Sequence, residues 1–185
     1  MKKKEIVQDH GALISDIETQ LVRDKIENAS IKEIILHLKQ THQLYRNYFI
    51  PGVEQLFTHL IKSNPDQPAV VILFNLFQKF SLSLDVHMKL EEEHIFSKCE
   101  RYFEDGQTNA FNVFEGHQKE EPYVTEIINF LSQTPFKNRL VHHQLISLMH
   151  AFNRNLQEHA WIEEDILTKK IQAKITLKLN KSLNT

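Results

Sequence analysis

Three short turn-rich stretches divide the chain into long segments that lack helix breakers. They are residues 63–68 (SNPDQP), 104–109 (EDGQTN) and 132–136 (SQTPF). The whole chain of 185 residues has only 4 glycines and 5 prolines, and the segments between the turns are rich in good helix formers. The pattern predicts helices at about 12–25, 30–62, 68–103, 108–133 and 135–172.

Short connections between long helices favour antiparallel neighbours. We therefore predict an all-α fold, an up-down-up-down four-helix bundle over residues 30–172. A short extra helix is expected in the N-terminal extension (1–29). A polar C-terminal tail at 173–185 is expected either to fray or to extend the last helix. A chain of this length is sufficient for one domain with its own core.

Charge and composition exclude several classes of function. Twenty-two basic and 24 acidic residues give a net charge of -2, which does not indicate nucleic-acid binding. The N-terminus lacks the apolar region of a signal peptide and no run of 18 apolar residues occurs, so a cytoplasmic protein without a membrane partner is expected. Cys99 is the only cysteine, which excludes an internal disulfide, and a half-buried thiol is expected there.

Histidine is the compositional outlier, with 11 residues. Apolar residues at helical spacing define one inward stripe on each long helix, and each stripe also contains a histidine. Residues four apart on a helix lie on the same face, so a glutamate four positions after a histidine points the same way. The residues that share the stripes in this manner are His42, His87 with Glu91, His117 with Glu121, and His159 with Glu163.

The depth of these residues along the helices gives a second test. His42 and His87 are almost equally far from Pro65 in the first turn, so antiparallel helices would bring them to one level. Glu91 and His117 match less well about Gly106, which requires staggered helices or longer connections.

A single histidine on an apolar stripe is usually a hydrogen-bonded core residue. Several imidazoles and carboxylates at one level are harder to accommodate, because each unpaired buried polar group costs about 2–7 kcal/mol against a domain stability of about 5–15 kcal/mol. A bound cation would compensate for this cost; a buried network of protonated histidines and glutamates is the alternative. The other histidines are expected on the surface: His10, His37, His59, His94, His142, His143 and His150.

Four imidazoles and two carboxylates exceed the needs of a tetrahedral zinc site and suit a pair of metal ions, for which we favour iron. Glu121 is a further candidate ligand, or an acceptor that holds His117. Tyr45 lies one turn from His42, a position from which its hydroxyl could donate a hydrogen bond to a small ligand at the metals.

Four motifs in this order resemble the hemerythrin-like (HHE cation-binding) superfamily: HQLY, HMKLEEEHIF, GHQKEE and HAWIEEDIL, spread over residues 31–167. The resemblance implies a four-helix bundle with two iron ions (Fe2+ or Fe3+, with an oxo or hydroxo bridge). The implied ligands are His42, His87, Glu91, His117, His159 and Glu163, with Glu91 and Glu163 bridging.

Oxygen-carrying hemerythrins place a second histidine four residues after the first in the third helix, where this chain has Glu121. The four-histidine, two-glutamate set is more similar to the iron–sulfur cluster repair group. Members of that group usually carry an N-terminal domain with a cysteine pair and often an acidic residue where this chain has Gly116. The expected function is a di-iron protein of O2, NO or oxidative stress, or of cluster repair. The alternatives are a non-catalytic oxygen or iron sensor and a metal-free structural bundle, and the sequence assigns neither a reaction nor a protein partner.

Overall fold

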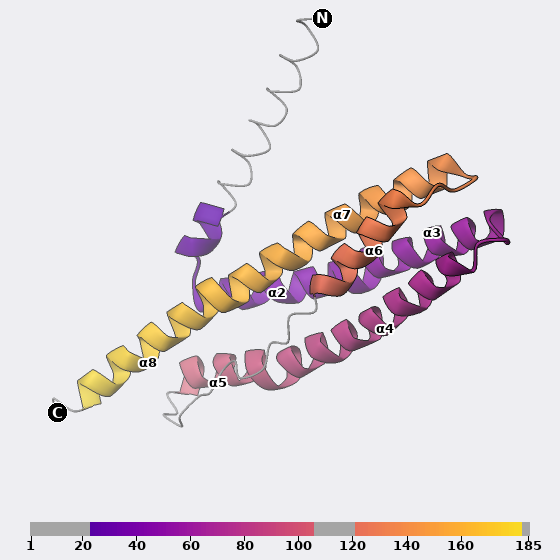
Figure 1. Cartoon of the computed structure of the whole chain (residues 1–185). Helices are drawn as coiled ribbons and strands as arrows, with labels where there is room; N and C mark the ends of the chain where they lie inside the picture. The colour runs from indigo at the N-terminus through magenta and orange to yellow at the C-terminus, as the bar shows by residue number, and fades with distance from the viewer. Residues whose placement is uncertain (1–22, 106–120, 183–185) are drawn as a thin grey trace, which may run out of the picture.

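The computed structural model describes residues 23–105 and 121–182, which form helices and the short turns between them (Figure 1). These ranges contain no strand, so the all-α prediction is confirmed for this part of the chain. Three long helical segments each consist of two α-helices joined by a wider π-helical turn. In chain order the elements are α2 (Ile31–Leu44), η1 (Tyr45–Phe49), α3 (Ile50–Ser63), α4 (Pro68–Leu90), η2 (Glu91–Phe96), α5 (Ser97–Asp105), α6 (Glu121–Gln133), α7 (Arg139–Trp161), η3 (Ile162–Leu167) and α8 (Thr168–Ser182).

Local sequence signals determine where the first two long segments begin. Ser30 and Glu33 form a capping box: the Ser30 hydroxyl accepts from the Glu33 backbone N–H at 3.3 Å, and the Glu33 carboxylate accepts from the Ser30 N–H at 2.7 Å. Pro68 begins α4, where its missing N–H has no helical partner to lose. Both starts lie within one residue of the predicted positions.

The last long segment begins later than predicted and extends into the predicted tail. A start at Pro135 was expected, but α7 begins at Arg139, and the side chain of the N-cap residue Asn138 accepts from the Val141 N–H. At the other end α8 continues to Ser182, so the segment from residue 173 extends the last helix, which is one of the two outcomes expected for it. Good helix formers occupy this polar segment, and Ile175 packs against buried residues. Of the predicted N-terminal helix, only residues 23–25 are described; residues 23–28 are helical.

The α3–α4 and α6–α7 turns lie at the same end of the molecule (Figure 1) and are joined through Asn64. This side chain is 2% exposed. Its amide donates to the Leu60 carbonyl at 2.8 Å, and its oxygen accepts from the Lys137 backbone N–H at 2.9 Å. Gln67 adds a bond to the Pro135 carbonyl. Asn64 therefore holds the two helix pairs in register at this end.

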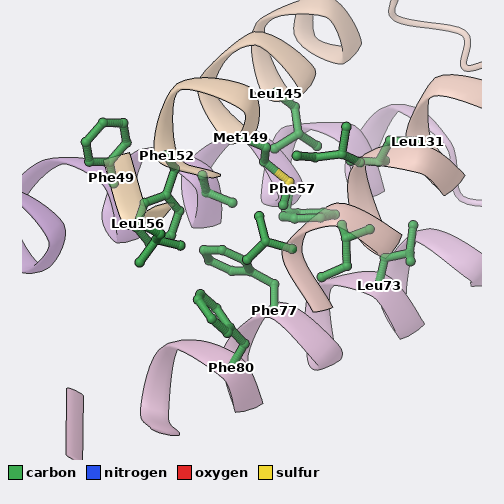
Figure 2. Packing of buried hydrophobic residues seen from close by; sticks show 14 of the residues in the cluster. Phe49, Phe57, Leu73, Phe77, Phe80, Leu131, Leu145, Met149, Phe152 and Leu156 are labelled. Atoms are coloured by element: carbon green, nitrogen blue, oxygen red, sulfur yellow. The ribbon is translucent and has the colours of Figure 1, made fainter. Parts of the chain in front are cut away.

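Buried apolar side chains form two separate clusters. The larger one, called the main core, is built from α3, α4, α6 and α7 with η1, and Figure 2 shows its packed phenylalanines, leucines and Met149. The second core is built from α2, η2, α5, η3 and α8, with Ile26 from the helical residues before α2. Its buried members are Ile26, Ile31, Ile34, Ile35, Leu38, Phe96, Cys99, Ile162, Leu167 and Ile171.

The three π-helical turns allow each long segment to contribute to both cores. A π turn has hydrogen bonds from residue i to i+5 and holds one residue more than an α turn; the Ile50 N–H bonds to the Tyr45 carbonyl in this way. In η2 both Glu91 and Phe96 are buried, although five residues of regular α-helix would turn them about 140° apart. The η2 turn therefore changes the phase of the inward stripe where the two cores meet.

The segment Pro68–Arg101 is long and apolar enough, by length and composition, to cross a membrane. Within its most apolar window 33% of the residues are buried inside the protein. The same segment contributes Phe77 and Leu84 to the main core and contains the buried Glu91. Core helices of globular proteins pass the same test, so this feature by itself is weak support for a membrane span.

Candidate metal centre

A layer of buried polar side chains lies where the main core meets the second core. It comprises His42 from α2, Glu91 from η2, His159 from α7 and Glu163 from η3, with exposed fractions of 0, 1, 8 and 1%. On each segment, the apolar residues on the two sides of this layer belong mainly to different cores. The π turns are adjacent to the layer or contain its members.

The ligand atoms of these four residues all lie within 4.8 Å of one another. The two imidazole Nε2 atoms are 3.2 Å apart, His42 Nε2 is 3.4 Å from Glu91 Oε2, and His159 Nε2 is 3.4 Å from Glu163 Oε1. Donors bound at about 2.0–2.2 Å to one ion in tetrahedral or octahedral geometry are about 2.8–3.6 Å from their neighbours. The three distances fall within that range, so the donor set fits a metal ion.

Glu91 also contacts His87, which lies four residues earlier in the same helical segment. Oε1 of Glu91 is 2.8 Å from His87 Nε2, whereas Oε2 faces His42. The His87 side chain is 32% exposed and lies at the edge of the buried layer. The two oxygens of one carboxylate are thus directed to histidines on different sides, an arrangement that suits a carboxylate shared by two metal ions.

Electrostatics favours a cation in this layer. Burial by itself raises the pKa of Glu91, but its interactions with the His42 and His87 side chains outweigh this effect and hold the pKa below its ordinary value. Burial lowers the pKa of His159 to about 4, against an opposing effect of the Glu91 charge. Near neutral pH the layer therefore contains an ionised carboxylate beside a neutral imidazole. This counts against His159 as a protonated member of a salt-bridge network.

Aromatic rings enclose the two buried histidines. Phe96 stacks on His42 with ring centroids 5.8 Å apart, and Tyr45 packs edge-on against His159 at 5.7 Å. Tyr45 is fully buried and its hydroxyl donates to the Asn155 backbone carbonyl at 3.0 Å. Burial and the nearby carboxylates raise the pKa of Tyr45, so the hydroxyl stays protonated. In this structure the Tyr45 hydroxyl therefore donates its hydrogen to the backbone carbonyl of Asn155.

A network of charged side chains borders the layer, and sequence reasoning did not identify it. Glu92 Oε1 lies 2.7 Å from His42 Nδ1 and accepts from Arg46 Nη1 at 2.8 Å. Arg46 Nε donates to Asp85 at 2.9 Å, and Lys89 pairs with the same aspartate at 2.7 Å. The signal was present in the sequence, because Arg46 follows His42 by one helical turn and Glu92 follows Glu91 directly.

Two predicted site residues cannot be placed. His117 lies outside the described residues, and the structure describes the backbone of Glu121, at the start of α6, but not its side chain. The structure thus brings together His42, Glu91, His159 and Glu163 and sets His87 beside Glu91. The ligand roles of His117 and Glu121 stay predictions.

His142 was wrongly expected at the surface. It is buried, its Nε2 lies 2.8 Å from the Leu131 carbonyl, and its ring packs edge-on against Phe136. It is a hydrogen-bonded core residue that links α6 to α7. His37 is partly buried, His10 lies outside the described residues, and the exposed ones are His59, His94, His143 and His150.

Cys99 is more deeply buried than expected, with 1% exposure in the second core. Burial raises the pKa of its thiol to about 12. It therefore packs as a small apolar residue and is not positioned as a thiolate ligand.

The layer thus offers two imidazoles and two carboxylates from three helical segments in an apolar surrounding. Mixed nitrogen and oxygen donors suit borderline and hard divalent or trivalent ions. Comparisons with protein-family models, with curated proteins and with solved structures gave no match. The site's own geometry therefore carries the functional inference.

Proposed function

We propose that this chain is a hemerythrin-like, non-haem di-iron protein, an up-down-up-down four-helix bundle that binds O2 or NO in the cytoplasm. Its role would lie in oxidative or nitrosative stress, or in the repair of iron–sulfur clusters. The observation that carries the proposal is the buried cluster of His42, Glu91, His159 and Glu163, whose ligand atoms lie within 4.8 Å of one another. The order of the four histidine motifs, and the two helix pairs whose turns lie at one end (Figure 1), support it further.

The arrangement of Glu91 supports two ions in preference to one. One of its oxygens faces His42 and the other faces His87, so the carboxylate can bridge. Ferritin-like helix bundles that hold paired metal ions also use inward carboxylates and histidines on facing helices, and such mixed donors suit iron. In this proposal His42, His87, His117 and His159 are terminal ligands, and Glu91 and Glu163 bridge.

The residues around the cluster would control access to the metals. Phe96 and Tyr45 cover the imidazoles of His42 and His159, and the two cores exclude water from both ends of the layer. A buried site of low polarity strengthens the electrostatic interaction between ligands and cation. Bound iron would supply the capacity to bind a diatomic molecule, which side chains alone lack.

Metal analysis of protein purified from iron-supplemented cells tests the proposal. We expect two irons per chain in the unaltered protein and a strong loss in His42→Ala and His159→Ala. His150→Ala is the matched control, because His150 is an exposed histidine of α7. An iron-free protein that also fails to bind added Fe2+, Mn2+ or Zn2+ would overturn the proposal, as would equal metal content in all four proteins.

A second experiment separates the possible roles of an iron-loaded protein. Incubation with an oxidatively damaged iron–sulfur enzyme, followed by its activity assay, tests repair; optical titration with O2 and NO tests ligand binding. Restored activity that depends on His42 would support repair. Reversible diatomic binding without restored activity would instead support the sensor, for which a protein partner would have to be sought.

A further inference from the structure

The side of His42 that faces away from the candidate ligand cluster contacts a carboxylate. We propose that Glu92, held by Arg46, is a positioning residue that keeps a proton on His42 Nδ1 and presents Nε2 as the metal-binding atom. This inference rests on the proposed metal binding and adds to it residues that do not themselves bind the ion.

The contacts of Glu92 define the position of the proton. Its Oε1 lies 2.7 Å from His42 Nδ1 and also accepts from Arg46 Nη1 at 2.8 Å. A guanidinium can only donate, so Glu92 Oε1 accepts in that contact, and we assign the hydrogen in its contact with His42 to the imidazole. A histidine that donates one ring N–H to a carboxylate has its tautomer and ring orientation fixed and is a stronger metal ligand.

Arg46 and its neighbours hold Glu92 in place. Arg46 is fixed by Asp85 through Nε at 2.9 Å, and Lys89 pairs with Asp85. The side chains of Glu92, Arg46 and Asp85 are 26, 21 and 30% exposed, so water solvates the network enough to keep it charged. Glu92 also lines a surface hollow with Lys39, Gln40 and Gln43.

His159 lacks an equivalent acceptor in the part of the chain that the structure describes. Its Nδ1 is buried without a hydrogen-bond partner, while its Nε2 lies 3.2 Å from His42 Nε2. With the His42 proton on Nδ1, the contact between the two Nε2 atoms requires the hydrogen to come from His159. In the metal-free protein His42 is therefore already in its binding tautomer, whereas His159 must release its Nε2 proton or transfer it to Nδ1 before it can bind.

The sequence offers a matched control for Glu92. Both segments carry a histidine, a glutamate four residues later and a second glutamate directly after it: His87, Glu91 and Glu92 in one, and His159, Glu163 and Glu164 in the other. Glu164 is exposed, whereas Glu92 turns toward His42. Replacement of Glu164 thus removes the same charge at the corresponding position without loss of a histidine contact.

Nitrogen-15 NMR of the imidazoles in the chelator-treated full chain tests the tautomers without any bound metal. We expect His42 protonated on Nδ1, the minor tautomer of histidine in water, and His159 protonated on Nε2. In Glu92→Ala the His42 signals should revert toward the common Nε2-protonated form, and in Glu164→Ala they should stay unchanged. An Nε2-protonated His42 in the unaltered protein, or no change in Glu92→Ala, would overturn the inference.

Zn2+ titration then measures the consequence for binding. Loss of such a partner typically weakens metal affinity by about 10–100-fold, so we expect that loss in Glu92→Ala, a smaller one in Glu92→Gln and none in Glu164→Ala. Glu92→Gln keeps the side-chain shape and serves if Glu92→Ala does not fold. Equal affinity in the unaltered protein and both Glu92 variants would overturn the positioning role. Should the unaltered protein bind no metal, the proposed function fails, while the NMR result still decides whether Glu92 sets the tautomer.

Discussion

The Nε2 atoms of His42 and His159 lie 3.2 Å apart between the two cores, although 117 positions separate the residues in the chain. The contact joins α2 to α7 in the middle of the molecule. Glu91 and Glu163 lie beside it, each with an oxygen 3.4 Å from one of the two nitrogens. A cation bound among these nitrogen and oxygen atoms would replace the contacts between them with metal–ligand bonds.

Metal binding should therefore stabilise the fold. A ligand that binds only the folded state, at a free concentration of about 100 times its dissociation constant, raises the free energy of unfolding by about 2.7 kcal/mol. We expect a shift of that order when Zn2+ or Fe2+ is added to chelator-treated protein, measured by thermal unfolding. His42→Ala should lose the shift and His150→Ala should keep it; the same shift in both variants would show that the ion binds elsewhere.

Cys99 should be unreactive in the folded protein at mildly alkaline pH. Burial raises the pKa of its thiol from 9.0 to about 12, so the thiolate that attacks alkylating reagents is scarce until the chain unfolds. The folded state retains a proton that the unfolded state releases, so this thiol lowers the free energy of unfolding above about pH 9 and has no effect below it. Mass spectrometry after iodoacetamide treatment, with and without urea, measures the reactivity. Rapid labelling without urea would contradict the burial of Cys99.

Asn64→Ala should destabilise the protein by about 1–3 kcal/mol, the cost of leaving buried hydrogen-bonding groups without their partner. The substitution removes the bonds to the Leu60 carbonyl and the Lys137 N–H, which connect the two turns at one end of the molecule. Urea denaturation measures the change. Asn47→Ala, at an exposed position of η1, should stay within about 0.5 kcal/mol of the original. Similar losses of stability at both positions would show that the hydrogen bonds of Asn64 contribute little to the free energy of unfolding.

Gly52→Val should destabilise the contact between α3 and α7. A Cβ atom at position 52 would lie 3.0 Å from Leu148 Cδ2, and a branched side chain adds further atoms to that contact. Overpacking of this kind costs about 1–3 kcal/mol. In Gly52→Ala the smaller overlap can be relieved by movement of Leu148, and the higher helix propensity offsets about 1 kcal/mol, so the net change should be small. Equal unfolding free energies for the two variants would contradict the close packing of Leu148 against Gly52.

The sequence by itself determined where most helices lie and which of their faces turn inward. Turn residues and caps act over a few positions, so the starts near Ser30 and Pro68 could be predicted. Apolar periodicity also placed His42 and Glu91 on inward stripes, and both are buried in the structure. The N-cap at Asn138 was missed because Pro135 gave a competing start signal three residues earlier.

Only the tertiary structure decided how these stripes meet. The η2 turn changes the phase within its segment, so that Glu91 and Phe96 face the same interior, which a fixed helical period does not reveal. Contacts between segments also decided that His142 is buried on the Leu131 carbonyl and that Glu92 reaches His42. The reason is physical: periodicity reports the average apolar side of one helix, whereas a hydrogen bond between helices depends on their separation, level and rotation, which packing sets.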